Sequence, residues 1–194
     1  MNTEQLRETI AQAGAGDARA YQRLLAGFGP RLYGYFYRAT GRHHDAEDLL
    51  GELTLRLVRT LPMYRDQGRF EPWLFRIAAN MVRDRIRRKK TRPQPASLSV
   101  EDEQGHSPSE GIPARMRDVD AGVLAQEASA RLEDALQSLD ETTRQMILMR
   151  HFGEMSFKDI ADMFQCPLGT ALAKVHRGMQ RLREELEDRE GTSP

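Results

Sequence analysis

The sequence predicts an all-α protein made of two small helical domains joined by a linker. Apolar residues recur at intervals of three and four along most of the chain, as they do on one face of an amphipathic helix. No segment has the alternation of apolar and polar residues that is typical of strands. A stretch rich in Pro, Ser, Gly and acidic residues, 93–122, has no sustained period and separates residues 1–92 from residues 123–194.

The composition restricts the classes of protein to be considered. The 194 residues are 39% hydrophobic and 30% charged, and the formal net charge is zero. The single cysteine, Cys166, excludes an internal disulfide and a cysteine-clustered zinc site, and it favours a reducing compartment. No apolar run approaches the roughly 18 to 20 residues that span a bilayer. We therefore expect a cytoplasmic protein without membrane insertion.

The first domain is expected to contain several helices with short breaks between them. Helical spacing runs from residue 17 to about residue 60, with Gly29-Pro30 as an interruption. Acidic residues early in "HHDAEDLL" favour the start of a helix because they face the positive end of its dipole. Pro62 closes that helix. The segment "MYRDQGRFEP" is then predicted to be a loop, and Pro72 suits the first turn of the next helix.

The next helix contains the most basic part of the chain, "RIAANMVRDRIRRKK" at residues 76–90. At helical spacing its apolar residues form one stripe, and a polar row lies opposite: Arg76, Asn80, Arg83 and Arg87. From Trp73 to Arg92 eight basic residues stand against one acid, whereas residues 93–127 carry seven acids against two basic residues. Charge segregated in this way indicates a polyanionic partner better than the net charge does.

The second domain is expected to consist of further helices beginning near Val123. Helical patterns occur in "RLEDALQSL", in "DETTRQMILMRHF" with Asp140 as candidate N-cap, and in "SFKDIADMF" with Ser156 as candidate N-cap. A turn, "QCPLG", precedes the last helix. In that helix large apolar residues repeat at four-three spacing and predict its packing face: Leu168, Leu172, Val175, Met179, Leu182 and Leu186.

Two segments suggest nucleic-acid binding. A helix, a short turn and a second helix carrying Lys and Arg have the pattern of a helix-turn-helix, although any two packed surface helices would look similar. The basic helix could be a solvated face. Against that reading, Asn80 can pair with a base edge, and aromatic residues in and after the preceding loop offer stacking faces for unpaired bases: Tyr64, Phe70 and Trp73. The combination favours DNA that is partly single-stranded.

The acidic helix gives no sign of catalysis. It places four acids beside a Leu row, and dipole complementation plus a core face accounts for both: Asp45, Glu47, Asp48 and Glu52. No His or Ser/Lys partner and no metal constellation accompanies them. His43-His44 fits a solvated pair better than a metal site, and no phosphate-binding glycine loop is present. We expect a protein that is not an enzyme and uses no metal or cofactor.

Taken in order, four segments resemble an extracytoplasmic-function sigma factor of bacterial RNA polymerase. These are "GDARAYQRLLAGFGPRLYGYFYRATG", "DAEDLLGELTLRLVR", "YRDQGRFEPWLFRIAANMVRDRIRRKK" and "SFKDIADMFQCPLGTALAKVHRGMQRLREEL". The resemblance implies a promoter-specificity subunit with sigma domain two at residues 1–92 and sigma domain four at residues 123–194. The linker between them would thread toward the active-site cleft and RNA exit path of the polymerase.

The resemblance also implies roles for particular residues. The acidic helix would dock on the β′ clamp of core polymerase through Asp45, Glu47, Asp48, Leu49, Glu52 and Arg56. The aromatic loop and basic helix would open the minus-ten element and hold a flipped base through Tyr64, Phe70, Trp73, Arg76, Asn80, Arg83, Arg87 and Arg88. The helix-turn-helix would read the duplex minus-thirty-five element through Thr170, Ala173, Lys174, Arg177 and Arg181. The partners would be core polymerase, including its β subunit, promoter DNA in duplex and single-stranded form, and an anti-sigma protein.

Two departures from the family pattern affect these expectations. Gly51 stands where the family usually has Gln before Glu52, in the helix that would dock on the clamp. In the recognition helix, polar positions of the family's "TVKSR"-like run are replaced by "TALAK" at residues 170–174. We therefore expect minus-thirty-five readout that is weaker or differently specified. Leu172 would be either buried with the apolar row or in contact with a thymine methyl group.

Two other functions stay open at this point. A stand-alone helix-turn-helix regulator that binds duplex DNA as a dimer would explain the C-terminal leucine row, but not the aromatic residues beside Asn80. An RNA-binding or scaffold protein would explain the basic face, but not the helix-turn-helix. For a sigma factor, the acidic linker, with Glu101, Asp102 and Glu103, is expected to fold back on the basic helix when polymerase is absent and to reduce non-specific DNA binding.

Overall fold

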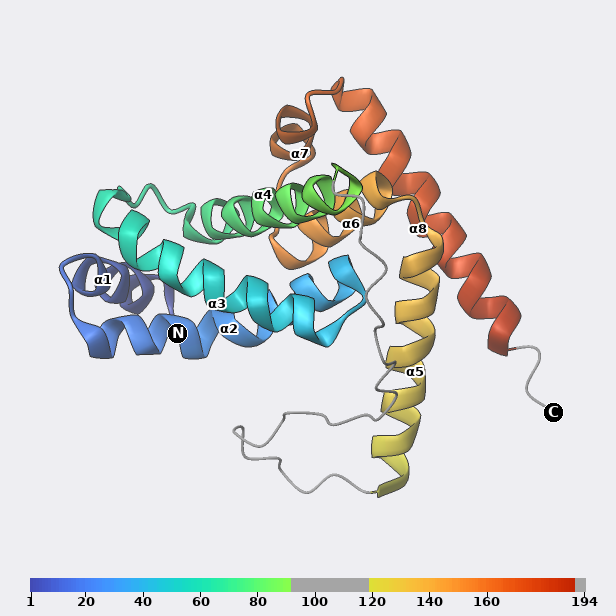
Figure 1. Cartoon of the computed structure of the whole chain (residues 1–194), viewed down its shortest axis with the longest axis horizontal. Coiled ribbons are helices and arrows are strands. Elements are labelled where there is room, and N and C mark those ends of the chain that lie inside the picture. The colour runs from blue at the N-terminus through green and yellow to red at the C-terminus, as the bar shows by residue number, and fades with distance from the viewer. Residues whose placement is uncertain (92–118, 191–194) are drawn as a thin grey trace.

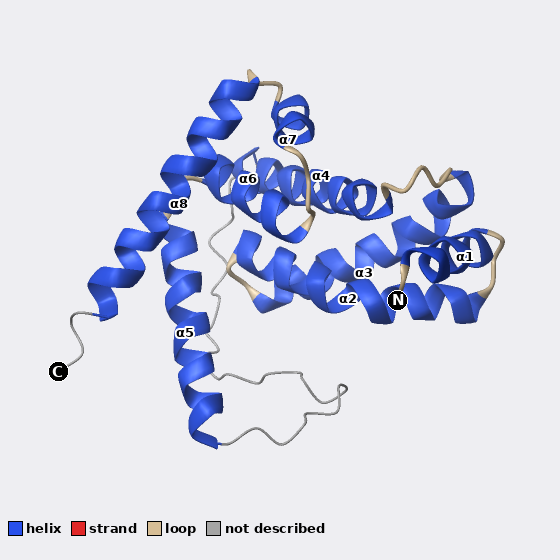
Figure 2. Cartoon of the chain, turned by 180° about the vertical axis from the view of Figure 1, so that it is seen from behind, coloured by secondary structure: helices blue, strands red, loops and turns tan. Residues whose placement is uncertain are grey.

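The described part of the chain is built from helices. The computed structural model describes residues 1–91 and 119–190, and every regular element within these two segments is helical (Figures 1 and 2). The predicted all-α class is therefore confirmed. Of the predicted linker, residues 93–118, with the acids expected to fold back on the basic helix, lie outside the described residues, and residues 119–122 belong to a helix.

The helices form two sets. The N-terminal bundle comprises α1 (Thr3–Gly14), α2 (Ala18–Thr40), α3 (His43–Thr60), a short 3-10 turn η1 (Leu61–Met63) and α4 (Phe70–Thr91). The C-terminal bundle comprises α5 (Val119–Ser138), α6 (Glu141–Phe152), α7 (Phe157–Phe164) and α8 (Leu168–Glu190). In Figure 1, α6 and α7 lie beside α4, whereas much of α5 and α8 extends away from the N-terminal bundle.

The first helix, α1, precedes the region in which periodicity indicates helices. It begins with a capping box: the side chain of Asn2 accepts a hydrogen bond from the Gln5 N–H at 2.8 Å, and the side chain of Gln5 accepts one from the Asn2 N–H at 3.1 Å. Ile10 and Ala13 are buried and join the core of the bundle. Short polar caps of this kind are a weaker sequence signal than a long apolar row.

The predicted break at Gly29-Pro30 is wrong, because Pro30 lies inside α2 without interrupting it. Proline removes the hydrogen bond to the carbonyl four residues earlier, here that of Ala26. Both residues are exposed, so water can satisfy that carbonyl. The opposite face of the helix holds the core residues Leu24 and Leu32, each 1% exposed. Burial of that face outweighs the missing bond.

The predicted boundaries of the next helices are confirmed. Helix α3 ends at Thr60, and Pro62 lies in η1 immediately after it. Helix α4 begins at Phe70, with Pro72 in its first turn, where the absent backbone N–H has no intrahelical partner to lose. In the C-terminal bundle Asp140 caps α6 by accepting from the Thr143 N–H, and Ser156 caps α7 by accepting from the Asp159 N–H, both at 3.1 Å.

The packing face of α8 differs from the predicted leucine row. Leu168, Leu172 and Met179 are 48%, 42% and 50% exposed. Val175 and Leu182 are buried as predicted, and the rest of the buried face is formed by Ala171 and Gly178. The prediction followed large side chains, but two of the contact positions carry the smallest ones. Leu172 is therefore on the surface, which answers the question that the sequence left open.

Small residues allow α8 to approach α6 closely. A Cβ atom placed on Gly178 would lie 2.5 Å from Cγ2 of Thr143 and 2.7 Å from Cδ1 of Ile147. Nothing larger than hydrogen fits at that point without displacing α6. The absence of a side chain at Gly178 thus sets the distance between the two helices of the C-terminal bundle.

The two bundles pack against each other through α6, which contacts both α2 and α4. At its C-terminal end a Cβ on Gly153 would lie 2.8 Å from Cβ of Phe75 in α4, closer than side chains normally approach. Arg31 of α2 donates a hydrogen bond to the carbonyl of Phe152 and pairs with Glu71 at 2.9 Å. The bundles therefore share a fitted contact in addition to their connection along the chain.

Candidate nucleic-acid interface

Helix α4 presents the predicted polar row. Arg76 and Asn80 are exposed on one side of the helix, and Arg88 is exposed farther along it. Arg87 is also exposed and pairs with Asp84 at 3.2 Å. The described structure thus brings the predicted row onto one helix, with its exposed members available to an external ligand.

The predicted aromatic residues form a cluster at the start of α4. The ring centroids of Tyr64 and Trp73 lie 4.4 Å apart, and Phe70 lies 5.5 Å from Tyr64 and 5.6 Å from Trp73. Phe70 is only 3% exposed and also packs edge-on against Phe28 of α2. Phe70 therefore supports the other two rings from below, and only Tyr64 and Trp73 are half-exposed.

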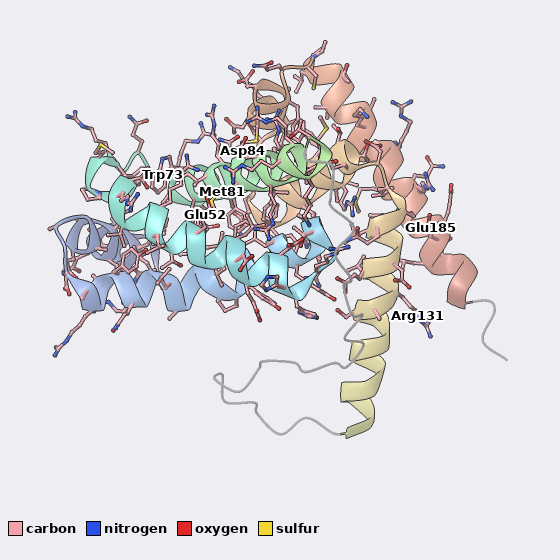
Figure 3. All side chains as sticks on the ribbon, viewed as in Figure 1. Glu52, Trp73, Met81, Asp84, Arg131 and Glu185 are labelled. Carbon is pink, nitrogen blue, oxygen red and sulfur yellow. The ribbon has the colours of Figure 1, made fainter. Side chains whose placement is uncertain are left out.

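Tyr64 and Trp73 line a depression of about 430 Å³ at the mouth of the loop, which we call the aromatic hollow. Figure 3 shows Trp73 at the loop end of α4. Three arginines share the lining: Arg65, Arg69 and Arg76. Burial raises the pKa of Tyr64 to about 12, and the nearby Asp66 carboxylate adds to this. The tyrosine therefore stays neutral, as a stacking surface requires.

The C-terminal bundle reaches into this region. Met155 and Asp159 also line the aromatic hollow. Asp159 accepts a hydrogen bond from Arg69 at 2.6 Å. A hydrogen bond from Ser156 lowers the pKa of the Asp159 carboxyl, and the positive charge of Arg69 lowers it further. The carboxylate is therefore ionised at neutral pH and stands at the entrance to the hollow.

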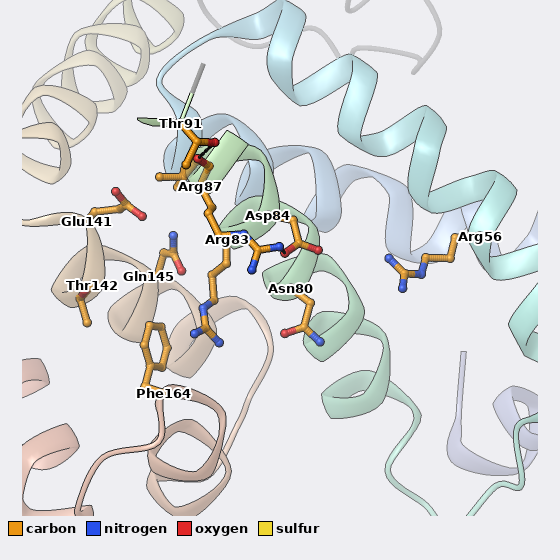
Figure 4. A pocket seen from close by; sticks show the side chains of 11 residues that line it. Arg56, Asn80, Arg83, Asp84, Arg87, Thr91, Glu141, Thr142, Gln145 and Phe164 are labelled. Carbon is orange, nitrogen blue, oxygen red and sulfur yellow. Dashed lines mark hydrogen bonds and ion pairs between the residues drawn. The ribbon is translucent and has the colours of Figure 1, made fainter. Parts of the chain in front are cut away.

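Arg83, a member of the predicted base-reading row, is engaged by the C-terminal bundle. Its Nη1 donates to the carbonyl of Met163 at 2.8 Å, and its guanidinium lies over the ring of Phe164 at 5.0 Å from the centroid. Figure 4 shows Arg83 extending from α4 toward Phe164, with Asn80 beside it on the same helix. Of the predicted row, Arg83 is the member least available to DNA in this arrangement.

An interbundle pocket of about 630 Å³ lies beside this contact. Asn80, Arg83 and Arg87 line it from α4, while Gln145 of α6 faces it from the other bundle (Figure 4). Gln145 is 1% exposed, and neither its Nε2 nor its Oε1 atom has a hydrogen-bond partner among the described residues. Unpaired buried amides are costly, so this part of the junction is imperfectly matched.

Helix α8 presents a second, open basic surface. Four of the predicted recognition residues are exposed on one face: Thr170, Ala173, Arg177 and Arg181. The fifth, Lys174, is half-buried, and its Nζ lies 3.7 Å from a carboxylate oxygen of Asp140. Leu172, exposed at 42%, adds an apolar side chain to this helix. The face can therefore meet a DNA groove without rearrangement of its own helix.

Helix α3 separates the predicted clamp-docking residues into two groups. Asp45 and Leu49 are 5% and 1% exposed and point into the bundle. Asp45 accepts hydrogen bonds from Arg85, at 2.6 Å, and from Lys89 of α4. Burial alone would raise the pKa of Asp45, but these two cations outweigh it and lower the pKa. Asp45 thus fastens α3 to α4.

The exposed face of α3 carries the other predicted residues: Glu47, Asp48, Glu52 and Arg56. Leu55 and Val58 lie between them at 66% and 54% exposure, and neither was among the predicted site residues. Their spacing could have identified them, because both fall out of phase with the buried Leu49, Leu53 and Leu57 of the same helix. These two exposed aliphatic residues lie one helical turn apart within a charged face.

Among the described residues, the histidines do not fit the geometry of a metal site, and the helices do not fit that of a membrane span. Within residues 1–91 and 119–190 no cluster of three or more His, Cys, Asp and Glu residues is arranged to hold a metal ion. Across the same ranges, no helix is both long enough and apolar enough to cross a membrane. His43 stacks on Tyr37 at 4.2 Å between ring centroids, whereas His44 is exposed near Asp48. Both histidines are exposed, in keeping with the expected solvated pair.

Two family models match the chain. The model for Sigma-70 region 2 matches residues 24–92, which include α3 and α4, and the model for Sigma-70, region 4 matches residues 129–182, which include α6 and α7. Among solved structures, CnrH in complex with the cytosolic domain of CnrY matches with a TM-score of 0.60 and 22% identity, covering 95% of this chain and 98% of that one. RpoE from Bartonella quintana, in complex with the anti-sigma factor NepR, has a TM-score of 0.60 at 19% identity, with 88% and 98% covered. These structures support the fold.

Curated relatives match over nearly the whole chain. The RNA polymerase sigma factor CarQ of Myxococcus xanthus is 33% identical over 174 residues, covering 88% of this chain and 91% of the relative. The ECF RNA polymerase sigma factor SigW of Bacillus subtilis is 29% identical over 189 residues, covering 94% and 97%. These matches cover most of the chain, including both helical bundles. The chain therefore belongs to the extracytoplasmic-function sigma factors of the sigma-70 family, which direct promoter-specific transcription by bacterial RNA polymerase.

Proposed function

We propose that this sigma factor binds core polymerase through α3, opens the minus-ten element with α4, and holds the minus-thirty-five element with α8. The N-terminal bundle would act as sigma domain two and the C-terminal bundle as sigma domain four. One observation carries the proposal: Arg76 lines the hollow formed by Tyr64 and Trp73, and Asn80 stands exposed one helical turn farther along α4. Guanidinium, amide and ring faces in one place suit an unpaired base attached to its phosphate backbone.

The chemistry at the minus-ten element is binding. Extruding a base from the duplex costs a few kcal/mol, and stacking on an aromatic ring returns about 1 to 3 kcal/mol per base. Tyr64 and Trp73 supply the stacking surface, and Phe70 keeps them in place. Asn80 can pair with a base edge while Arg76 and Arg88 neutralise phosphates. The sigma factor would thus shift the equilibrium toward melted DNA, and the polymerase would perform the catalysis.

The minus-thirty-five surface would act differently. Arg177 and Arg181 can contact phosphates along a duplex groove, and Thr170 can bond to a base edge or phosphate. Ala173 offers no hydrogen bond, and exposed Leu172 can contact a thymine methyl group. We expect this surface to contribute affinity through phosphates and modest sequence discrimination, in keeping with the replacement of polar family positions.

Core polymerase would bind the exposed face of α3. The proposed contact surface consists of its exposed charged and aliphatic residues: Glu47, Asp48, Glu52, Leu55, Arg56 and Val58. Leu55 and Val58 give the charged face an apolar centre, the arrangement found in many protein interfaces. Asp45 and Leu49 would act from inside, by fixing the helix that carries this surface. The β′ clamp is the proposed partner, with the β subunit a further partner.

Regulation by an anti-sigma protein and action in the cytoplasm are part of the proposal. The solved structure of Bartonella quintana RpoE is a complex with the anti-sigma factor NepR. A protein of the same family and fold is a reasonable target for the same class of inhibitor. Core polymerase and promoter DNA are both cytoplasmic in bacteria, which sets the compartment in which the sigma factor would work.

The test is transcription by reconstituted holoenzyme. Purified protein and core polymerase would be assayed on fragmented genomic DNA of the source bacterium, with start sites mapped and promoter melting followed by permanganate reactivity. We expect promoter-dependent initiation that neither component gives alone. Sequence-specific binding of duplex DNA by a dimer, without association with core, would support the stand-alone regulator instead.

Asn80→Ala separates base capture from assembly. We expect open complexes to fall by roughly tenfold or more, the effect of losing one good base contact, while core binding stays unchanged because α3 does not contain the residue. Thr91→Ala, at an exposed position of the same helix, is the matched control for general damage to α4. Loss of core binding in Asn80→Ala would reassign this residue to a structural role.

A further inference from the structure

The interbundle pocket has features of a small-molecule site that the proposed function does not use. Its volume of about 630 Å³ lies within the range of pockets that hold small ligands. Residues of α3 and α4 line it together with residues of α6 and α7. We propose that this pocket binds an adenine nucleotide. The site stands independently of the proposed function, and only the effect of the nucleotide on DNA binding rests on that function.

Gln145 is the residue that points to a base. Its side chain is 1% exposed and faces the pocket from α6, and its Nε2 and Oε1 atoms have no partner among the described residues (Figure 4). Buried amides without partners are rare, because their desolvation is not offset. A glutamine amide can donate to N7 of adenine and accept from its N6 amino group. Guanine presents two acceptors along the same edge, N7 and O6, and cannot satisfy both atoms of the amide.

Phe164 and Arg83 give the same pocket a planar surface. The guanidinium of Arg83 lies over the Phe164 ring, 5.0 Å from its centroid, and its Nη1 donates to the carbonyl of Met163 at 2.8 Å. These two contacts hold the guanidinium in place. Phe164 is half-buried, so part of its ring is accessible. Bases stack on aromatic rings and on guanidinium planes alike, and the pocket therefore offers stacking as well as hydrogen bonds.

The charged residues of the pocket favour the phosphates of a nucleotide. Three arginines line it against two carboxylates: Arg56, Arg83 and Arg87 against Asp84 and Glu141. The side chains of Arg87 and Asp84 are 77% and 45% exposed and pair at 3.2 Å. Exposed ion pairs are weak, whereas a guanidinium binds phosphate through two parallel hydrogen bonds. A phosphate group can therefore replace Asp84 as the partner of Arg87.

A nucleotide in this pocket would share residues with promoter DNA. Asn80 and Arg87 line the pocket and also belong to the proposed minus-ten surface, whereas Gln145 and Phe164 belong to the C-terminal bundle. A bound nucleotide would exclude a single strand from Asn80 and Arg87. The concentration of adenine nucleotide would then determine what fraction of the free sigma factor can bind melted DNA.

Isothermal titration calorimetry of the full-length protein, without polymerase or DNA, tests the site with ADP as the probe. GDP carries the same phosphates on another base, and pyrophosphate carries the phosphates alone. We expect ADP to bind roughly tenfold more tightly than GDP, the effect of one good bidentate pair, and pyrophosphate to bind more weakly still. Equal affinities for all three would mean that the basic helix attracts any anion, and would overturn the inference. Absence of ADP binding at millimolar concentration would overturn it as well.

Gln145→Leu removes the amide and keeps a side chain of similar size. We expect affinity for ADP to fall roughly tenfold, to the level of GDP. The urea midpoint should stay the same or rise, because a buried amide without a partner has been removed. A lower midpoint would show that the amide already has a partner within the protein, and would reject its assignment to a base. Unchanged affinity for ADP in the folded variant would also reject it.

Two variants of α4 test the phosphate contact in opposite directions. Arg87→Ala should weaken ADP binding by roughly tenfold, the effect of losing a charge-assisted hydrogen bond. Asp84→Ala frees Arg87 and removes a carboxylate from the pocket, so it should strengthen binding by roughly two- to fivefold, the scale of an exposed ion pair. Arg88→Ala is the matched control, because it removes the same charge at an exposed neighbouring position that does not line this pocket. Equal weakening by Arg87→Ala and Arg88→Ala would attribute the effect to long-range charge and overturn the phosphate contact.

Competition with DNA would be measured with a fluorescein-labelled single strand of 15 mixed-sequence nucleotides. ADP should displace the strand from wild-type protein but not, at the same concentration, from Gln145→Leu. Equal displacement from both proteins would overturn the competition. The site and the proposed function fail separately. Protein that binds ADP selectively but does not direct initiation with core polymerase would reject the proposed function alone, whereas protein that directs initiation and binds no ADP would reject the nucleotide site alone.

Discussion

Helices α4 and α8 are both basic and both proposed to contact DNA, yet they differ in how much of their surface is free. The reading face of α8 is exposed, because its buried face packs on α6 through small residues such as Ala171 and Gly178. Helix α4 has a wide buried face: Phe75, Ala78 and Ala79 are each 0% exposed. The proposed groove-binding face of α8 is therefore open, whereas the proposed base-reading face of α4 shares Arg83 with contacts from α7.

The two helices also differ in the use of their charges. On α4, Arg85 and Lys89 are held by the buried Asp45, and Arg83 by a backbone carbonyl. On α8 the described pairs are exposed or long, as in the contact of 3.7 Å between Lys174 and Asp140. Basic residues on α4 therefore serve the fold as well as the ligand. A count of positive charges overestimates the DNA-binding capacity of α4.

The largest expected effect comes from removing the anchor of α4. Asp45→Ala should lower the free energy of unfolding by about 2 to 3 kcal/mol, because it leaves Arg85 partly buried without its main partner. Urea denaturation would measure this, with Asp48→Ala, an exposed neighbour paired to the same arginine, as control. An effect as small as that of the control would mean that the charges of α4 are free for DNA, as on α8.

The same pair predicts a pH dependence. The pKa of Asp45 is lowered in the folded protein, so its contribution to stability is present above the ordinary value of 3.8 and is lost as the pH falls through the lowered pKa. Wild type should therefore lose stability relative to Asp45→Asn only in strongly acidic solution. A difference that disappears near neutral pH would contradict the assignment.

A smaller effect is expected where α8 meets α6. Gly178→Ala should destabilise the protein by about 1 to 2 kcal/mol, because the added Cβ would overlap Thr143 and Ile147 and the gain in helix propensity offsets only part of this. Gly169→Ala is the control, since no atom lies within 4 Å of a Cβ placed there. Thermal unfolding of both variants measures the difference. Equal stability would show that α6 can retreat from α8 without cost.

These two sites illustrate what sequence patterns could and could not predict. Periodicity and caps located α3, α4 and α6 to α8, because burial of an apolar face and satisfaction of end groups are local properties. The row on α8 was misjudged, since a close helix contact selects glycine and alanine at positions that carry no hydrophobic signal. The prediction at Pro30 was wrong for the opposite reason. Proline is a strong local signal for a helix break, but burial of the other face of α2 outweighs it.

The sequence predicted which residues form the candidate site better than it predicted which of them are exposed. The spacing of Arg76 and Asn80 fixes their common face on any helix. Whether Phe70 is a contact or a support, and whether Asp45 points outward, depends on neighbours that are distant in sequence, such as Phe28 and Arg85. The cover that α7 places over Arg83 is a further tertiary contact, which no periodicity within α4 could indicate.

The smallest expected effect concerns the joint that keeps the bundles together near α5. Burial raises the pKa of Glu133, although the Tyr37 hydroxyl and the positive charges of Arg38 and His43 oppose this, and Asp134 adds to it. A raised pKa means that docking is favoured below the ordinary value of 4.5 and weakens as the pH rises through the raised value. Near neutral pH the ionised, half-buried carboxylate thus weakens the contact between α5 and α2.

Glu133→Gln removes this pH dependence. At neutral pH we expect a gain of about 0.5 kcal/mol or less in unfolding free energy, the scale of a partly exposed charge effect. At pH 4 the variant and wild type should converge, because the wild-type carboxyl is then protonated as well. Asp134→Asn, exposed beside it, is the control. If the free energies of unfolding of Glu133→Gln and wild type differed by the same amount at every pH, the change would come from packing of the amide and not from the charge of Glu133.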